Sequence, residues 1–183
     1  MKKFGVKEVV ATAILAALVF VLIRCVAIPT PLPDTSLSIY AAVVAFFSIL
    51  FGPAVGFIGG FVGHLLVDVT AGWGIWWSWI VPTGLFGLLV GTFCNKIDLM
   101  SGNFGTKEVV RLNIVQVISA LICWGLVAPL GDIIFYKEPA SKVFAQGIFI
   151  GISAIVSTAI VTTIICKAFA ASRAQSGSLK KED

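Results

Sequence analysis

Long apolar segments alternate along this chain with short stretches that are polar or rich in proline and glycine. The apolar residues form continuous runs, and a helix needs a run of about 20 residues to cross a bilayer. Because hydrocarbon offers backbone amides no partner, a bundle of helices is expected and a β-barrel is not. The pattern predicts six membrane-spanning helices, at about 6–27, 38–51, 53–69, 75–93, 107–130 and 142–171.

Prolines and glycines mark the predicted breaks. Residues 29–33 hold three prolines and end the first helix, because proline fixes φ and donates no hydrogen bond. The pair Gly52 and Pro53 separates the short second helix from the third. There is no internal repeat, so residues 1–171 are predicted to form one membrane domain. Residues 172–183 are polar and serine-rich and are predicted to be a disordered cytoplasmic tail.

Composition and charge agree with a membrane protein and predict its orientation. Hydrophobic residues make up 58% of the chain and charged residues 12%, against roughly 25% charged in soluble domains, which excludes an ordinary soluble domain. The basic residues lie in short groups between apolar runs, so no nucleic-acid partner is expected. Of 13 Lys and Arg residues, only Arg24, Lys137 and Lys142 fall on the side away from the termini. Both termini are therefore predicted to be cytoplasmic, in a multi-pass protein of the bacterial plasma membrane.

Several kinds of chemistry are excluded by what the sequence lacks. Its four cysteines lie far apart and its single histidine is His64, so neither a metal site nor a disulfide framework is indicated, and no cofactor is expected. It has no Walker A motif, so it is not expected to hydrolyse ATP itself. It also lacks the inverted halves of many secondary transporters.

Four tryptophans gather at the predicted outer end of the bundle: Trp73, Trp76, Trp77 and Trp79. Indoles favour the membrane interface, so an aromatic belt is one explanation. The cluster is denser than a belt needs, and Trp76 and Trp79 share a helical face. Some of the indoles are therefore expected to turn inward and stack on a planar, mostly neutral ligand.

Other candidate binding residues lie at the same end. His64 and Asp68 are spaced i, i+4 on one face of the third helix, and ionisable residues in a membrane span indicate a functional site. The other explanation is a structural pair between Asp68 and either Arg24 or His64. Trp124 and Gln146, near the outer ends of the fifth and sixth helices, complete the predicted substrate site.

Small residues mark one face of the first helix. Ala13 and Ala17 form a small-xxx-small pair beside Ala16, which allows another helix to approach closely. Such a face can pack inside the bundle or dock a separate protein, and the residues alone leave both open.

These residues together resemble the small six-helix substrate-binding subunits, called S components, of energy-coupling factor (ECF) vitamin transporters. The resemblance covers nearly the whole chain. Its motifs are Ala13-x-x-x-Ala17, Ile28-Pro-Thr-Pro-Leu-Pro-Asp34, Phe51-Gly-Pro-Ala-Val-Gly-Phe57, Gly63-His-Leu-Leu-Val-Asp68 and Trp76-Trp-Ser-Trp79. Within the family they look like the subgroup often called riboflavin-type, in which cobalamin transport is also known.

The resemblance implies a vitamin-binding transport subunit and not an enzyme. S components bind one vitamin in an outward-facing cavity that three outer loops close. Pro31, Leu32, Pro33 and Asp34 of the first of these loops are therefore expected to form part of a lid.

The same resemblance implies partners. The family's Ala-x-x-x-Ala surface contacts a transmembrane coupling subunit, which would place Ala13 and Ala17 at that interface. The coupling subunit works with two cytosolic ATPases, and the binding subunit is thought to topple in the bilayer and carry its pocket toward the cytoplasm.

The identity of the vitamin depends on the subgroup and on charge. Few basic residues fall on the outer side, which disfavours strongly anionic substrates. The resemblance favours cobalamin (vitamin B12), and riboflavin, which is planar and neutral, is the alternative. Two other classes stay open: an independent membrane carrier, and an integral-membrane enzyme that only the spacing of His64 and Asp68 suggests.

Overall fold

The structure, a computed structural model, describes residues 4–33 and 35–179, with side chains as far as residue 174. The chain is all-α apart from one short strand pair, and 80% of it is helical. The segments η2, η3 and η4 are π-helical, and η1 is a 3₁₀ turn. The elements in chain order are α1 (Val6–Arg24), β1 (Ile28–Pro29), β2 (Ser36–Leu37), α2 (Tyr40–Phe51), α3 (Pro53–Ala71), α4 (Trp77–Phe93), η1 (Leu99–Ser101), α5 (Thr106–Ile122), η2 (Cys123–Val127), α6 (Ala128–Gly131), η3 (Asp132–Tyr136), α7 (Ala140–Ser157), η4 (Thr158–Thr162) and α8 (Thr163–Leu179).

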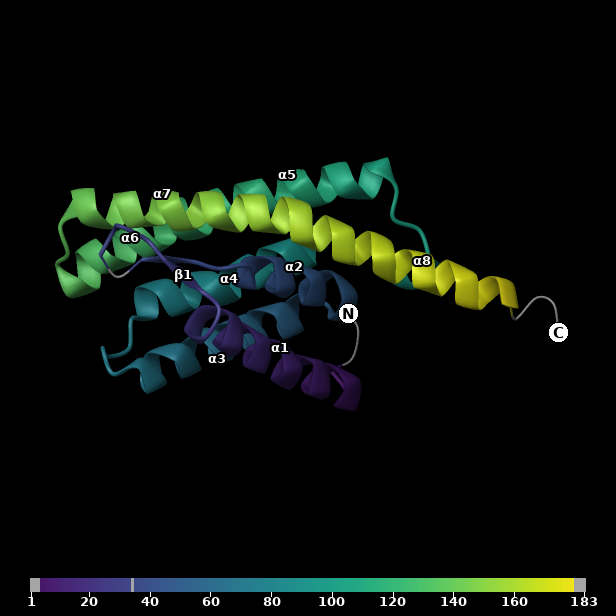
Figure 1. Cartoon of the computed structure of the whole chain (residues 1–183), viewed down its shortest axis with the longest axis horizontal. Coiled ribbons are helices and arrows are strands. Elements are labelled where there is room, and N and C mark those ends of the chain that lie inside the picture. The colour runs from purple at the N-terminus through teal and green to yellow at the C-terminus, as the bar shows by residue number, and fades with distance from the viewer. Residues whose placement is uncertain (1–3, 34, 180–183) are drawn as a thin grey trace.

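The helices run along one long axis of the bundle (Figure 1). The elements α5, α7 and α8 lie on one side and α1 and α3 on the other, and α2 and α4 contact helices of both groups. The loop between α3 and α4 and the turn before α7 lie at one end, on the left of Figure 1, and α8 ends at the opposite end.

Six helices make up the described part of the chain, because the π-helical segments continue the helices on either side of them. Four are long and apolar enough to cross a membrane by length and composition, and α2 and α4 are apolar but shorter. The all-α prediction is thus confirmed, whereas the count of six spans and the side of the termini stay predictions. The four long helices are Val6–Arg24, Pro53–Ala71, Thr106–Tyr136 and Ala140–Ala174.

The last two helices are longer than the sequence predicts. The sequence predicts a loop at 131–141 between these helices. The predicted start of this loop is wrong, because helical structure continues to Tyr136. Pro129 cannot donate a helical hydrogen bond, and the π-helical segment that precedes it lets the helix continue past this proline. The final helix likewise extends to Leu179, so the predicted end of the membrane domain at residue 171 falls within α8.

A two-stranded antiparallel ribbon, absent from the predicted elements, forms between α1 and α2. Ile28 pairs with Leu37 and Pro29 with Ser36, so the proline-rich segment turns back on itself. Pro29 is tolerated because this ribbon has only two strands and so lacks a central position. The pairing holds the intervening loop at the end of the bundle.

Helices α3 and α4 pack with their backbones nearly in contact. A Cβ atom built on Gly87 would lie 2.5 Å from the carbonyl carbon of Gly56, and one built on Gly84 would lie 2.9 Å from the carbonyl oxygen of Phe57. Glycine is needed on this interface because any side chain would push the helices apart. The close packing fixes the relative position of His64 on α3 and Trp79 on α4.

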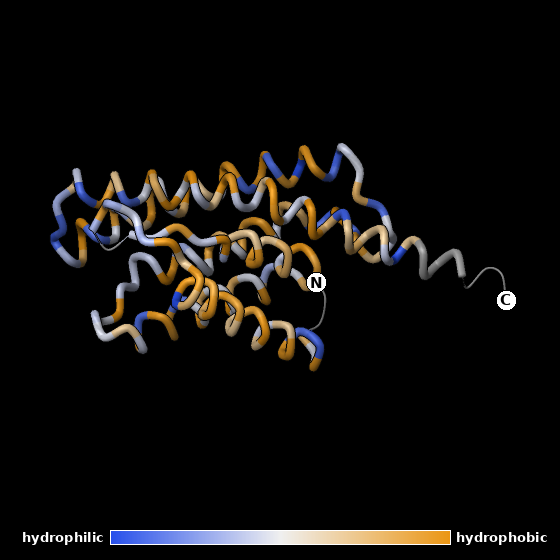
Figure 2. The backbone as a smooth tube through the Cα atoms, in the orientation of Figure 1, coloured by the Kyte–Doolittle hydropathy of each residue, from blue (hydrophilic) through white to orange (hydrophobic). Residues whose placement is uncertain are grey.

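The outer surface of the bundle is largely apolar. Ile14, Ile118 and Ile160, from three different helices, are 48%, 53% and 56% exposed. Figure 2 shows hydrophobic residues along the helices and hydrophilic ones gathered toward the two ends. A soluble monomer rarely exposes contiguous apolar surface on this scale, so the pattern is that of a protein surrounded by lipid.

Candidate functional site

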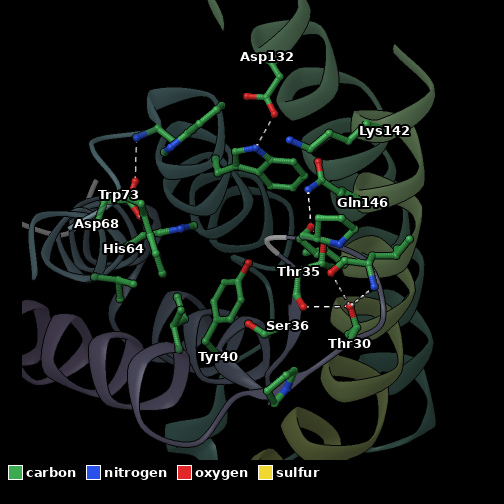
Figure 3. Close-up of a pocket in the computed structure, with 18 of the residues that line it drawn as sticks. Thr30, Thr35, Ser36, Tyr40, His64, Asp68, Trp73, Asp132, Lys142 and Gln146 are labelled. Atoms are coloured by element: carbon green, nitrogen blue, oxygen red, sulfur yellow. Dashed lines mark hydrogen bonds between the residues drawn. The ribbon is translucent and has the colours of Figure 1, made fainter. Parts of the chain in front are cut away.

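A cavity of about 660 Å³ lies at the end of the bundle where α1 and α3 end and α2, α4 and α7 begin (Figure 3). Its volume is typical of sites that enclose a small organic ligand, roughly 300–1,000 Å³. Aromatic, apolar and polar side chains line it together. The lining residues are Ile23, Pro29, Thr30, Pro31, Leu32, Pro33, Thr35, Ser36, Tyr40, His64, Val67, Asp68, Trp73, Trp76, Trp79, Asp132, Lys142, Gln146 and Ile150.

Asp68 is buried and organises the start of the tryptophan cluster. Its carboxylate accepts hydrogen bonds from the indole Nε1 of Trp73 at 3.2 Å and from the backbone N–H of Trp76 at 2.8 Å. Among the described residues no salt bridge joins Asp68 to Arg24 or His64, although Asp68 lies close enough to His64 to interact with it electrostatically. Asp68 fixes the Trp73 indole and the backbone of Trp76 at the cavity wall.

His64 is held beside the cavity by Thr83. The Thr83 hydroxyl oxygen lies 2.7 Å from Nδ1 of His64 and 3.0 Å from the carbonyl oxygen of Trp79. Nδ1 of His64 is thus paired with Thr83, as donor or acceptor according to the tautomer. Nε2 is the ring nitrogen that remains for a ligand.

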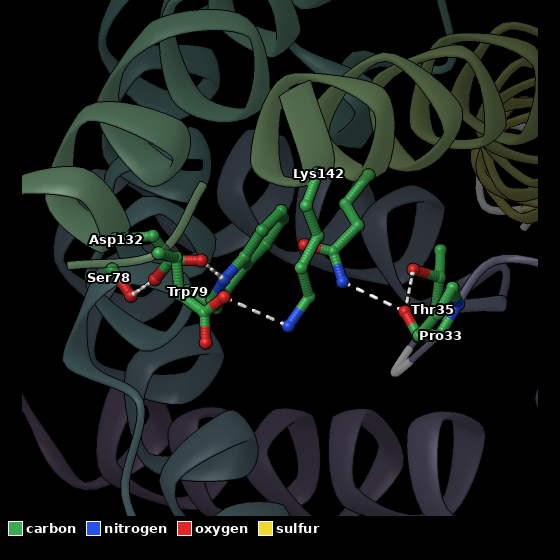
Figure 4. A network of polar contacts seen from close by, with 8 residues as sticks. Pro33, Thr35, Ser78, Trp79, Asp132 and Lys142 are labelled. Carbon is green, nitrogen blue, oxygen red and sulfur yellow. Dashed lines mark hydrogen bonds and ion pairs between the residues drawn. The ribbon is translucent and has the colours of Figure 1, made fainter. Parts of the chain in front are cut away.

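Asp132 is the buried carboxylate on the opposite wall, and the sequence did not single it out (Figure 4). It lies in η3, is 2% exposed, accepts a short hydrogen bond from the Ser78 hydroxyl and accepts another from Nε1 of Trp79 at 2.8 Å. Two hydrogen bonds, from Ser78 and Trp79, thus connect α4 to the fifth helix. Both carboxylate oxygens of Asp132 are hydrogen-bonded. The bond to Nε1 fixes the orientation of the Trp79 indole, and a ring face of this indole is available for a ligand to stack on.

The loop between β1 and β2 covers the cavity from the side. Thr30 closes this loop on itself, because its backbone N–H and its hydroxyl both donate to the carbonyl oxygen of Thr35, at 3.1 and 2.9 Å. Gln146 on α7 donates from Nε2 to the carbonyl oxygen of Pro33 at 2.9 Å. A side-chain hydrogen bond therefore attaches this loop to α7.

Of the eight predicted substrate-site residues, the structure brings six to this cavity: Trp73, Trp76, Trp79, His64, Asp68 and Gln146. Three of the four predicted lid residues, Pro31, Leu32 and Pro33, also line it, and Asp34 lies outside the described residues.

Two predicted substrate-site residues lie elsewhere. Arg24 is exposed at the end of α1 and is not part of the cavity lining. Trp124 is fully buried behind the lining, with its ring centroid 6.2 Å from that of Tyr40 and 4.9 Å from that of Phe86. Its π-helical turn directs the indole into the core of the bundle.

The other indole of the cluster points away from the cavity. Trp77 is 47% exposed and stacks on Phe61 with ring centroids 6.1 Å apart. Trp76 packs on Tyr136 at 4.4 Å, and the Tyr136 hydroxyl donates to the carbonyl oxygen of Ile75. The cluster is thus divided between a cavity wall and an outer surface.

Besides Asp132, sequence reasoning missed the lining residues Thr30, Thr35, Ser36, Tyr40 and Lys142, which give the cavity polar character. Tyr40, at the first turn of α2, looks like an ordinary interfacial aromatic in the sequence. In the sequence, Lys142 served only as one of the outer basic residues that predict the orientation of the chain. In the structure it lines the cavity and forms a 3.1 Å ion pair with Glu138. The only available sign was their position beside the predicted outer loops.

Removing the Asp132 carboxylate is expected to destabilise the protein. Asp132→Ala leaves the Ser78 hydroxyl and the Trp79 indole N–H unpaired in a buried site, which costs about 1–3 kcal/mol in the free energy of unfolding. The comparison variant is Asp98→Ala, which removes an exposed carboxylate at the other end of the bundle; it loses only the hydrogen bond from the backbone N–H of Met100 and leaves no buried donor unpaired. Chemical unfolding in detergent micelles measures both variants. Equal stability of Asp132→Ala and wild type would contradict the bonded role of Asp132.

Sequence comparison with known proteins shows the family of this chain. A sequence model of the family described as "ECF-type riboflavin transporter, S component" matches residues 3–171. The chain belongs to this family. It is also similar to proteins of Streptococcus pneumoniae named only "UPF0397 protein": 47% identical over 180 residues in strain CGSP14 and 46% in strain Taiwan19F-14, covering 98% of each chain in both comparisons.

Membership of the S-component family settles the class of the protein. S components are transport subunits and not enzymes, so the enzyme alternative is excluded by the family match. The family also implies a vitamin ligand and partner ECF subunits. Together with four helices long enough to span a bilayer, this indicates a membrane transport protein.

Proposed function

We propose that this chain is the vitamin-binding subunit of an ATP-driven ECF importer in the bacterial plasma membrane. The observation that carries the proposal is the cavity of about 660 Å³, in which two buried carboxylates hold the indoles of Trp73 and Trp79 at the wall. Aromatic surface for stacking and a few fixed polar groups for orientation are what a small organic ligand needs.

The proposed topology has six spans, cytoplasmic termini and a cavity that opens outward. Lys96, Lys107 and Arg111 lie near the ends of α4 and α5 that are far from the cavity, whereas Lys142 and Arg24 lie at the cavity end. Cytoplasmic ends carry an excess of Lys and Arg, so this division supports an outward-facing cavity. The short helices α2 and α4 then lie inside the bundle, in contact with the longer ones.

Riboflavin is our first candidate for the vitamin. Its flat ring system can stack on the Trp79 indole, and its imide group can hydrogen-bond to Nε2 of His64. It is small enough to be enclosed by a cavity of about 660 Å³ beneath the lid. The description of the matched family names the same vitamin.

Cobalamin, which the sequence resemblance placed first, is the second candidate. The hydroxyls of Thr30, Ser36 and Tyr40 and the amide of Gln146 line the cavity and suit the amides on the rim of a corrin. A molecule of this size exceeds the enclosed volume, so binding it requires the loop between β1 and β2 to move away from Gln146.

The partners follow from the family. We propose that a transmembrane coupling subunit docks on α1 at Ala13 and Ala17 and that two cytosolic ATPases supply the energy. Both alanines are exposed, whereas the neighbouring Ala16 is 6% exposed and packs inward. An exposed pair of small residues one helical turn apart allows a partner helix to approach closely.

Substitution of the cavity tryptophans tests the proposal. Trp76→Ala and Trp79→Ala are expected to weaken vitamin binding by about 1–3 kcal/mol, the usual cost of losing a stacking aromatic. Trp77→Ala is the matched control, because this indole stacks on Phe61 outside the cavity lining. Fluorescence or calorimetric titration of the purified chain gives each affinity. If all three variants bound with wild-type affinity, the tryptophans would belong to the interface belt only.

A further inference from the structure

A second hollow lies at the end of the bundle opposite the vitamin cavity, and the proposed function makes no use of it. It is an open groove of about 530 Å³ between the end of α4 and the first turns of α5. Phe93 forms one wall, and the other is built from Thr106, Lys107, Val110, Arg111 and Ile114 of α5.

Two positively charged side chains lie side by side in this groove. Lys107 and Arg111 are one helical turn apart on the same face of α5. Nε of Arg111 donates to the carbonyl oxygen of Phe93 at 2.8 Å, which holds the guanidinium at the groove and leaves its other N–H groups to bind an anion.

Neither cationic side chain is neutralised by a carboxylate of the described residues. Within the part of the chain that the structure describes, neither Lys107 nor Arg111 forms an ion pair with a carboxylate. The nearest acidic residue in the sequence, Glu108, accepts a hydrogen bond from the backbone N–H of Gly105 at 2.9 Å. The N-terminus of α5 adds a partial positive charge at the same place.

An apolar strip leads away from the cations along α5. Val110 and Ile114 line the groove and are 51% and 56% exposed, and Ile118 and Leu121 continue the same strip at 53% and 57% exposed. Their spacing of three and four residues keeps them on one helical face. A positive end joined to an exposed apolar strip matches a phosphate headgroup joined to an acyl chain.

We propose that this groove binds an anionic phospholipid, with its phosphate between Lys107 and Arg111 and one acyl chain along the strip of Val110, Ile114, Ile118 and Leu121. Basic pockets between membrane helices on the cytoplasmic side are typical sites for anionic headgroups. An unpaired arginine and lysine prefer a lipid of net negative charge over a zwitterionic one, whose own ammonium group offsets the phosphate. The proposal requires only that the chain is embedded in a bilayer and is independent of the vitamin.

Lipid titration of the purified full-length chain, followed by native mass spectrometry, tests this site. Phosphatidylglycerol is expected to bind more tightly than phosphatidylcholine with the same acyl chains. Lys107→Gln and Arg111→Gln are each expected to weaken phosphatidylglycerol binding roughly fivefold. Lys96→Gln is the control, because this exposed lysine lies at the same end and outside the groove.

Three results would overturn the proposal. They are equal affinity for the two lipids, full displacement of phosphatidylglycerol by inorganic phosphate at matched concentration, and unchanged binding in the Lys107→Gln variant. Lys107→Gln keeps the hydrogen bond between Arg111 and Phe93, so it remains informative if Arg111→Gln fails to fold. Vitamin titration of the same variants is expected to match wild type, which separates failure of this site from failure of the proposed function.

Discussion

Replacing Ala13 or Ala17 by tryptophan is expected to abolish association with the coupling subunit and to leave vitamin binding intact. The two methyl groups lie exposed on α1, one turn apart, and their small size is what permits close approach of a partner helix. An indole at either position would hold the partner away from the backbone. The cavity is lined by other residues and is not altered by these changes.

Co-purification of the chain with its coupling subunit and ATPases measures this effect, and a vitamin titration of the isolated variant checks its fold. Ile118→Trp supplies the control, because it adds an indole to a 53% exposed, lipid-facing position on α5. Normal assembly of both alanine variants would show that the partner docks on another face.

Adding one methyl group at the contact of α3 and α4 is expected to destabilise the bundle strongly. In Gly87→Ala the new Cβ would lie 2.5 Å from the carbonyl carbon and oxygen of Gly56, which are backbone atoms and cannot rotate away. The two helices must separate, and overpacking of this kind costs about 1–3 kcal/mol or more. His64 and Trp79 would move apart with them, so vitamin affinity is expected to fall as well.

A matched control exists on the fifth helix. A Cβ added at Gly125 has no neighbouring atom within 4 Å, so Gly125→Ala is expected to leave the midpoint of thermal unfolding near that of wild type. The comparison uses the same chemical change at two positions that differ only in contact. If Gly87→Ala unfolded at the same temperature as Gly125→Ala, the close backbone packing would be wrong.

The helices could be predicted from the sequence because continuous apolar runs and prolines act locally. The six predicted segments each correspond to a helix of the structure, with errors of a few residues at most ends. The largest errors are at the ends of the last two helices, which reach Tyr136 and Leu179 where the predicted ends are residues 130 and 171. In the fifth helix the π-helical segments η2 and η3 have no pattern in the apolar residues, so the continuation past Pro129 could not be predicted. The pairing of Ile28 with Leu37 was missed for a similar reason, because two-residue strands carry no periodicity.

The site could be predicted only in part. Trp73, Trp76 and Asp68 were found because aromatic and ionisable residues stand out in an apolar chain, whatever their exact orientation. The rotation of each helix about its axis depends on packing, so the sequence could not tell that Trp124 points into the core and Arg24 to the surface. Asp132 was assigned to a loop, and only its place in η3 reveals that it is buried against Ser78 and Trp79.

Calorimetric titration of the purified chain with riboflavin, and separately with cobalamin, tests the central claim most directly. The predicted result is saturable binding of one vitamin per chain, with riboflavin the tighter of the two, in the absence of any partner subunit. Tighter binding of cobalamin would keep the chain as a vitamin binder and show that the lid opens around a larger ligand. Absence of heat from both vitamins, with a chain that unfolds cooperatively in the same detergent, would contradict the claim that this cavity binds either vitamin.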